Sequence, residues 1–369
     1  MKRYDVVLFY TLSRVHNHYL PIVRELGKRL RIAVVLADTK KHVKTAATER
    51  LFLDLVESFG ADVIEAGGID GRLLLVPQFR YQDGFLAALD RHVRAERRVA
   101  LQTFGHGVEN LAPLAEIGID RLFVYDRRVF ENKYRTPDER RWVEERFELV
   151  EMGSPVARYP VFPDVRMDWL VAFPTELSFP TTAHKVRFSR NVERLLARVP
   201  TGDRAVLKLH NVSDGGRLIE RNSRVFRAGE AIGRRGVDVP LVPGPGRAGE
   251  WMSRAAFGAA YGRITRRVDP LSALTTAFNL GLELFLPGVT TGLVTGRSSV
   301  VWYALLHRLP VYNCDDETVL VRGEGVTDSY RAFGVPPCAG RLAFDPAHFD
   351  RISPSAREAN LIDLIQKEL

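Results

Sequence analysis

Short apolar strands alternate with amphipathic helices along this chain, and the alternation is the feature that most restricts its fold. The chain opens with the β-branched apolar run YDVVLFY at 4–10. Apolar residues at helical spacing follow at 20–30, and a second apolar run, RIAVVLAD, occupies 31–38. Such a strand–helix–strand unit forms a right-handed crossover between two parallel strands. Because the pattern recurs, the sequence predicts a doubly wound parallel sheet.

The rest of the first half repeats this pattern. Further elements are expected at 45–60 (helix), 61–68 (strand), 85–98 (helix), 98–104 (strand), 119–126 (strand) and 139–153 (a charged helix, then a strand). Parallel strands bind ligands beyond their carboxyl ends, so residues that carry chemistry are expected directly after the strands.

A second series of the same kind begins at 167, after the proline-punctuated stretch 154–164, which marks the expected domain boundary. This series predicts a strand at 167–174, a helix at 186–199, a strand at 205–210, a long loop at 239–251, a helix at 298–308 and a strand at 309–313. We therefore expect an α/β protein with two Rossmann-like, doubly wound parallel sheets facing across a cleft. Residues 1–160 form the first domain, residues 166–350 the second, and a C-terminal helix in 351–369 packs back on the first.

Charge and composition narrow the class of partner. The chain carries 53 Lys+Arg against 45 Asp+Glu, a net charge of +8 at pH 7, which favours anionic partners such as nucleotides, phosphorylated substrates or lipid head groups. Cys314 and Cys338 are too few for a disulfide scaffold and lack the paired spacing of a zinc site. The start of the chain lacks the hydrophobic region of a signal peptide, and the apolar tract 278–294 is too interrupted to span a bilayer. We expect a cytoplasmic protein that meets a membrane only at its inner surface.

The segment QTFGHG at 102–107 follows an expected strand and is the first candidate for chemistry. Glycines on both sides of His106 allow a sharp backbone bend that exposes one imidazole at a strand end. A group that titrates near neutral pH can act there as a general base. A turn histidine that only hydrogen-bonds the backbone is an equally open interpretation.

Two later segments have the chemistry of phosphate binding. Lys208 and His210 lie on the same face of the strand at 205–210, so that both aim donors in one direction. Arg297, Ser298 and Ser299 form a small-residue turn before a helix, where hydroxyls and backbone N–H groups can bind an anion. A solvated strand end and a simple helix cap are the alternatives.

Other features are less specific. His16 and His18 have no carboxylate or thiol nearby in the sequence, so no metal site is expected and contact with an acceptor substrate is a weak possibility. The arginines of 217–267 lack interleaved aromatic residues and a nucleic-acid-binding motif, so no nucleic acid is expected. The chain contains neither G-x-x-x-x-G-K-[ST] nor a G-x-G-x-x-G after its first strand, which disfavours kinases and dehydrogenases.

Five segments in order resemble one enzyme family. They are TFGHG at 103–107, VEMGSP at 150–155, LVAFPTE at 170–176, AVLKLH at 205–210 and LVTGRSSVVWYALLHRLPVYN at 293–313. Together they resemble the CDP-glycerol glycerophosphotransferase (teichoic acid polymerase) family and the related bacterial capsule transferases of the glycosyltransferase B (GT-B) fold. Two positions depart from that pattern: Asn211 replaces a proline, and Gly296-Arg297 replaces an acidic residue.

The resemblance implies an inverting, metal-independent transfer of a sugar or glycerol-phosphate-type unit. The donor would be CDP-, CMP- or UDP-linked, the acceptor a cell-surface glycan or lipid-linked, and no further cofactor is implied. His106 would be the catalytic base, and Glu109 would orient it or contact the acceptor. Side chains of the second domain would bind the donor: Thr175, Glu176, Lys208, His210, Arg297, Ser298 and Ser299.

Three other readings stay open at this point. A nucleotide-sugar epimerase-like or hydrolase-like enzyme of the same fold would use the cleft without an acceptor. A non-catalytic nucleotide-binding protein of a surface-polysaccharide pathway would bind the nucleotide without needing His106. An arginine-rich nucleic-acid binder would show a steep dependence of duplex binding on salt concentration.

Overall fold

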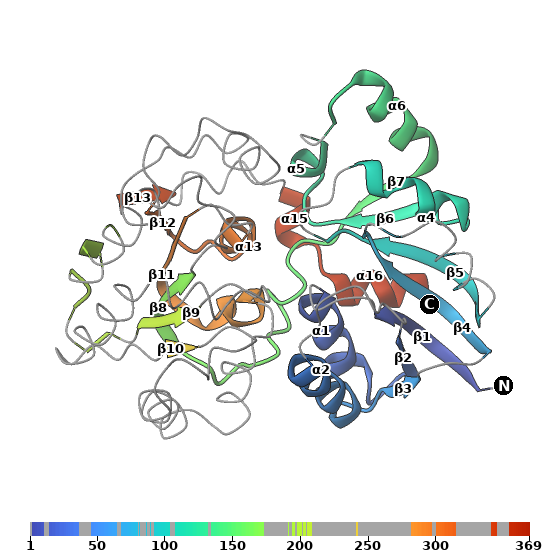
Figure 1. Ribbon diagram of the computed structural model, residues 1–369, viewed down its shortest axis with the longest axis horizontal. Coiled ribbons are helices and arrows are strands. Elements are labelled where there is room, and N and C mark those ends of the chain that lie inside the picture. Colours follow the sequence, from blue (N-terminus) through green and yellow to red (C-terminus); the bar gives the residue numbers. More distant parts are fainter. Residues whose placement is uncertain are drawn as a thin grey trace. The chain divides into compact units, whose positions relative to one another are not determined.

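Figure 1 shows the protein as a computed structural model. The structure describes residues 2–10, 15–36, 46–64, 68–79, 81, 86, 89, 92–103, 108–131, 134–172, 191, 194–195, 198–200, 202–203, 205–208, 241–242, 282–296, 300–314, 341–344 and 354–369. The chain divides into two compact units, which we describe separately. The N-terminal unit comprises residues 1–44, 49–161 and 352–369, and the C-terminal unit comprises 45–48 and 162–351.

A seven-stranded parallel sheet forms the centre of the N-terminal unit. Its spatial order is β3-β2-β1-β4-β5-β6-β7, and every neighbouring pair is parallel. The order reverses between β1 and β4, the place where ligands of doubly wound sheets bind. The strands are β1 (Arg3–Tyr10), β2 (Ile32–Leu36), β3 (Asp62–Ile64), β4 (Ile69–Pro77), β5 (Val93–Leu101), β6 (Arg121–Val124) and β7 (Glu148–Glu151).

The described helices of the N-terminal unit follow these strands in the chain, and two more come from the C-terminal end of the chain. They are α1 (His16–Leu26), α2 (Ala46–Ser58), the 3-10 helix η2 (Val108–Asn110), α4 (Ala112–Glu116), α5 (Arg127–Glu131), α6 (Pro137–Arg146), α15 (Pro354–Glu358) and α16 (Leu361–Glu368). Helix α16 packs against α1 and buries Leu361, Ile362 and Ile365. Glu368, at its end, forms ion pairs with Arg121 and Arg97. The last helix thus stabilises the first one.

The C-terminal unit is built on a six-stranded sheet of order β10-β9-β8-β11-β12-β13. Among its described strands, only the edge pair β12–β13 is antiparallel. The order reverses between β8 and β11, so the two sheets share one winding scheme. Its elements are β8 (Met167–Ala172), β9 (Ala205–Lys208), β10 (Leu241–Val242), the 3-10 helix η4 (Leu282–Gly288), β11 (Val289–Thr295), α13 (Val300–Leu306), β12 (Val311–Asn313) and β13 (Arg341–Phe344).

The predicted α/β class with two Rossmann-like, doubly wound sheets is confirmed. Their placement across a cleft stays a prediction. No helix in the described part of the chain is both long and apolar enough to cross a membrane.

Several expected elements were wrong. Residues 93–98 belong to β5 and not to a helix, because the charged residues of this segment lie at the exposed amino end of a strand that pairs along β4. Strand β4 was absent from the expected elements. The first helix begins at His16, ahead of the expected start at 20. The expected loop at 239–251 contains β10, which pairs with β9.

The expected single C-terminal helix is two helices, α15 and α16. Asn360 separates them with an extended backbone, and its side-chain oxygen accepts a hydrogen bond from the Ile362 N–H at 2.7 Å. An N-cap of this kind begins a new helix. The sequence pattern of apolar residues continues across this break and does not reveal it.

Candidate functional site

Buried polar side chains gather at the carboxyl ends of the four central strands of the N-terminal sheet. All are at most 2% exposed. We call this group the carboxyl-edge cluster; it consists of His16, Asn17, His18, Gln78, Gln102, Thr103, Tyr125 and Asp126. They follow β1, β4, β5 and β6 in the chain and therefore surround the point where the strand order reverses.

His16 is part of an aromatic stack. Its ring lies parallel to that of Phe52, with centroids 4.4 Å apart, and its Nε2 is 3.0 Å from the hydroxyl of Tyr10, the last residue of β1. Tyr10 also stacks on Phe52 at 4.5 Å. The stack joins the end of β1 to α1 and α2.

His18, on the same helix, takes part in hydrogen bonds. Its Nε2 lies 2.7 Å from the Tyr125 hydroxyl, which also accepts a hydrogen bond from the Asn17 side-chain amide at 3.4 Å. Burial lowers the pKa of His18 to about 3, against an opposing interaction with the backbone of Gln102. The imidazole is therefore neutral at physiological pH.

The sequence interpretation of His16 and His18 as weak acceptor contacts stays a prediction, and the structure places both rings in the interior. Among the described residues, no group of three or more His, Cys, Asp or Glu side chains could hold a metal ion.

The end of β5 is fixed to both neighbouring strands. On one side, Gln102 N–H donates to Phe123 O at 2.8 Å, and the Gln102 side-chain oxygen accepts from Tyr125 N–H at 2.9 Å. On the other side, Gln78 N–H donates to Leu101 O at 2.7 Å, and the Thr103 hydroxyl donates to Gln78 O. Side chains thus continue the sheet's hydrogen bonding past the last strand residue.

The predicted base follows this fixed point directly. Thr103, the first residue of the TFGHG motif, is described and buried, whereas His106 lies outside the described residues. The chain continues at Val108, which is buried in η2, and Glu109 belongs to the same 3-10 turn. Both flanks of the motif are therefore anchored in the N-terminal unit.

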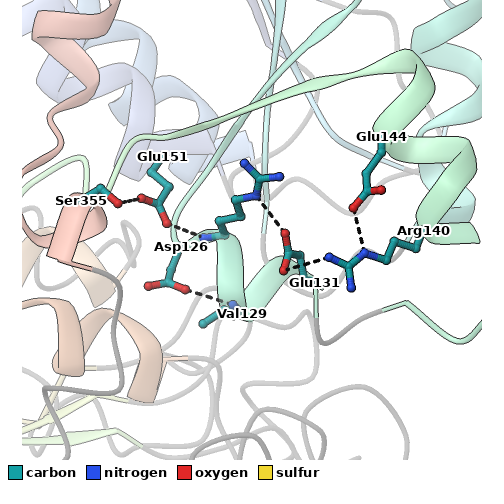
Figure 2. Close-up of polar contacts among 8 residues, drawn as sticks. Asp126, Val129, Glu131, Arg140, Glu144, Glu151 and Ser355 are labelled. Atoms are coloured by element: carbon teal, nitrogen blue, oxygen red, sulfur yellow. Dashed lines mark hydrogen bonds and ion pairs between the residues drawn. The ribbon is translucent and has the colours of Figure 1, made fainter. Parts of the chain in front are cut away.

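Polar contacts also hold the end of β6 (Figure 2). The Asp126 carboxylate accepts from Val129 N–H at 3.0 Å and so caps α5. Glu151 of β7 accepts from Arg127 N–H at 2.9 Å and from the Ser355 hydroxyl. Ion pairs extend from α5 to α6 through Arg127–Glu131, Glu131–Arg140 and Arg140–Glu144.

The C-terminal sheet aligns the ends of the strands that precede the predicted donor residues. Lys208 ends β9 and pairs with Ala172, which ends β8; Ala172 pairs in turn with Thr295, which ends β11. The Thr295 hydroxyl donates to Ala172 O at 3.0 Å and is fully buried. The three strand ends therefore form one row across the middle of the sheet.

Most predicted donor residues follow this row in the chain. Thr175 and Glu176 come after β8, His210 after β9, and Arg297, Ser298 and Ser299 after β11, each within four residues of the strand end. Apart from Lys208, whose backbone ends β9, they lie outside the described residues. The sequence predicts these strand ends. It does not predict that Asn17, Gln78, Gln102, Thr103, Tyr125 and Asp126 belong to the carboxyl-edge cluster, because their burial depends on the fold.

Comparisons with known proteins assign no family. No family model and no curated protein matches the chain. Among solved structures, it is similar to the calicheamicin glycosyltransferase CalG4, at 14% identity over 100% of this chain and 99% of that one, with a TM-score of 0.44. The UDP-GlcNAc 2-epimerase of Neisseria meningitidis matches at 11% identity over 98% and 97%, with a TM-score of 0.41. The wall teichoic acid polymerase TagF matches at 11% identity over 98% and 83%, with a TM-score of 0.42. Similarities this distant assign no activity to this chain.

Proposed function

We propose that this protein is an inverting, metal-independent transferase of the GT-B type. It moves a sugar or glycerol-phosphate-type unit from a CDP-, CMP- or UDP-linked donor to a cell-surface glycan or lipid-linked acceptor. One observation carries the proposal: each predicted site segment follows the carboxyl end of a central strand in one of two sheets with the same winding. These are the positions at which doubly wound sheets bind ligands.

The donor is assigned to the row formed by the ends of β8, β9 and β11. Lys208 ends β9, with His210 two residues further on, and Arg297 follows β11 by two residues. Cationic and hydroxyl side chains placed together at such an edge suit the phosphates of a nucleotide donor. Ser298, Ser299, Thr175 and Glu176 complete the proposed donor site.

The acceptor and the base are assigned to the N-terminal unit. His106 takes the proton from an acceptor hydroxyl, whose oxygen forms the new bond to the transferred unit. The bond between that unit and the nucleotide phosphate breaks, and its electron pair goes to the phosphate oxygen. Lys208, His210 and Arg297 stabilise the charge that develops there. Glu109 orients His106 or contacts the acceptor, and the net charge of +8 favours contact with an anionic membrane surface.

Nucleotide release tests this function. Wild type and His106→Ala are incubated with CDP-glycerol, CMP-linked and UDP-linked sugars, with and without a lipid-linked glycan extract from bacterial membranes. We expect release that needs the extract and is lost in His106→Ala, while nucleotide binding by that variant is retained. Release of the nucleotide, or isomerisation of the donor sugar, without the extract would instead indicate an epimerase-like or hydrolase-like enzyme. Binding with neither release nor isomerisation would indicate a non-catalytic nucleotide-binding protein.

A further inference from the structure

Three buried side chains connect α1, β5 and β6 in a closed circuit. His18 of α1 is bonded to the hydroxyl of Tyr125, the residue after β6. The backbone N–H of Tyr125 is bonded to the side chain of Gln102, the residue after β5. The backbone of Gln102 interacts in turn with His18. No member is more than 2% exposed, so water does not compete for these contacts.

This circuit leaves one polar atom unsatisfied. Within the described part of the chain, Gln102 Nε2 has no hydrogen bond of normal geometry, although it is buried. A buried donor or acceptor without a partner destabilises the folded state, and apolar side chains would fill the same space without that penalty. Packing alone therefore does not explain these residue types.

The circuit holds the carboxyl end of β5 in place by hydrogen bonds. Gln102 is held by β6 through its N–H and its side chain, and Thr103 is held by the residue after β4 through its hydroxyl. The next residue, Phe104, begins the remainder of the TFGHG motif.

We propose that Gln102, Tyr125 and His18 are positioning residues that fix the strand end from which the His106 segment begins. This inference rests on the proposed function. It adds that the contacts among Gln102, Tyr125 and His18 of α1 fix the start of the segment that carries His106. Because the low pKa keeps His18 neutral, the circuit contains no charged side chain.

The test compares two circuit variants with a matched control at the opposite end of the same sheet. Tyr125→Phe removes the hydroxyl that bonds His18, and Gln102→Met removes the amide that bonds Tyr125 N–H. The control, Tyr4→Phe, removes the hydroxyl of another buried tyrosine, which donates to Asp62 at 2.7 Å in a part-buried bond near the amino end of β1. The measurements are hydrogen exchange of the backbone amides of 103–108 and the NMR titration of His106, assigned by its loss in His106→Gln.

We expect both circuit variants to speed exchange at 103–108 by about tenfold or more, against an unchanged rate in Tyr4→Phe, and to shift the titration midpoint of His106. His18→Gln, which keeps a hydrogen-bonding group beside Tyr125, should retain more protection than His18→Leu. If either variant fails to fold, this His18 pair carries the comparison. Equal exchange and an equal His106 titration in all variants would overturn the proposal. These readouts need no substrate, so failure of the proposed transfer shows separately, as absence of nucleotide release by wild type.

Discussion

At the scale of single residues, the surroundings of Gly153 show why a glycine follows β7 in the VEMGSP segment. Its φ is +61°, and an added Cβ would lie 2.3 Å from the carbonyl oxygen of Ala356 and 2.9 Å from that of Ala359. Residues with a side chain rarely adopt such a backbone conformation. Here the two carbonyl oxygens also occupy the space that the Cβ would need. Gly153 thus permits α15 and the residue after it to lie close to the chain that follows β7.

Gly153→Ala should therefore lower the unfolding midpoint more than Gly118→Ala. Both glycines have positive φ, but no atom in the described part of the protein lies within 4 Å of a Cβ added at Gly118. The strained backbone alone costs about 1–3 kcal/mol. Thermal denaturation of both variants measures the additional effect of the Ala356 and Ala359 carbonyl oxygens at position 153. Equal unfolding midpoints would contradict the prediction.

His18 should make stability fall in mild acid. Its pKa is about 3 in the folded protein and about 6.5 unfolded, so above pH 6.5 it is neutral in both states. Below pH 6.5 the His18 imidazole becomes protonated in the unfolded chain but stays neutral in the folded protein. The free energy of unfolding therefore falls by about 1.4 kcal/mol per pH unit. Urea titrations between pH 6.5 and 5 should show a shallower fall for His18→Gln than for wild type. The exposed His92→Gln serves as control, and equal slopes for His18→Gln and wild type would refute the prediction.

At the scale of elements, α16 is the helix on which α1 depends. Its apolar residues pack against α1, and Arg158 adds an ion pair to Asp363 at 2.8 Å. Helix α1 carries His16 and His18, so the packing of α16 against α1 also stabilises these two members of the carboxyl-edge cluster.

Asn360→Ala should destabilise the N-terminal unit by about 1 kcal/mol, because Ile362 N–H loses its partner at a buried helix start. Asn360→Asp retains an oxygen acceptor and should restore most of the loss. Chemical denaturation of the two variants provides the comparison. Equal loss in both would show that the cap contributes little.

Element prediction succeeded where burial and propensity agree. The apolar runs of β1, β2 and β8 have few alternatives as buried parallel strands. The amino half of β5 was mistaken for a helix because its arginines, Ala95 and Glu96 favour a helix locally; pairing with β4 overrides that preference. Local sequence does not contain that information.

The candidate site shows the same division. Strand ends and glycine-flanked turns are visible in sequence, which is why His106 and Lys208 were identified. The circuit of His18, Gln102 and Tyr125 depends on β5 and β6 lying side by side and on α1 beginning at His16. Its members are far apart in the chain, and only the fold brings them together.

At the scale of the whole molecule, the proposed transfer requires two sheets with different roles, a base on the first and a nucleotide donor on the second. The two reversals of strand order, at β1/β4 and β8/β11, give each sheet a place for its role. Donor binding is the part on which every later step depends. It can be measured without knowing the acceptor.

The most direct test is the unfolding midpoint with CMP, CDP, UMP, UDP, GDP and ADP, for wild type, His210→Ala and the control His92→Ala. A ligand at 100 times its Kd stabilises the folded state by about 2.7 kcal/mol, a shift of a few degrees. The account predicts a shift with cytidine or uridine nucleotides alone, present in wild type and His92→Ala and absent in His210→Ala. No shift with any nucleotide, or an equal shift in His210→Ala, would contradict the donor site.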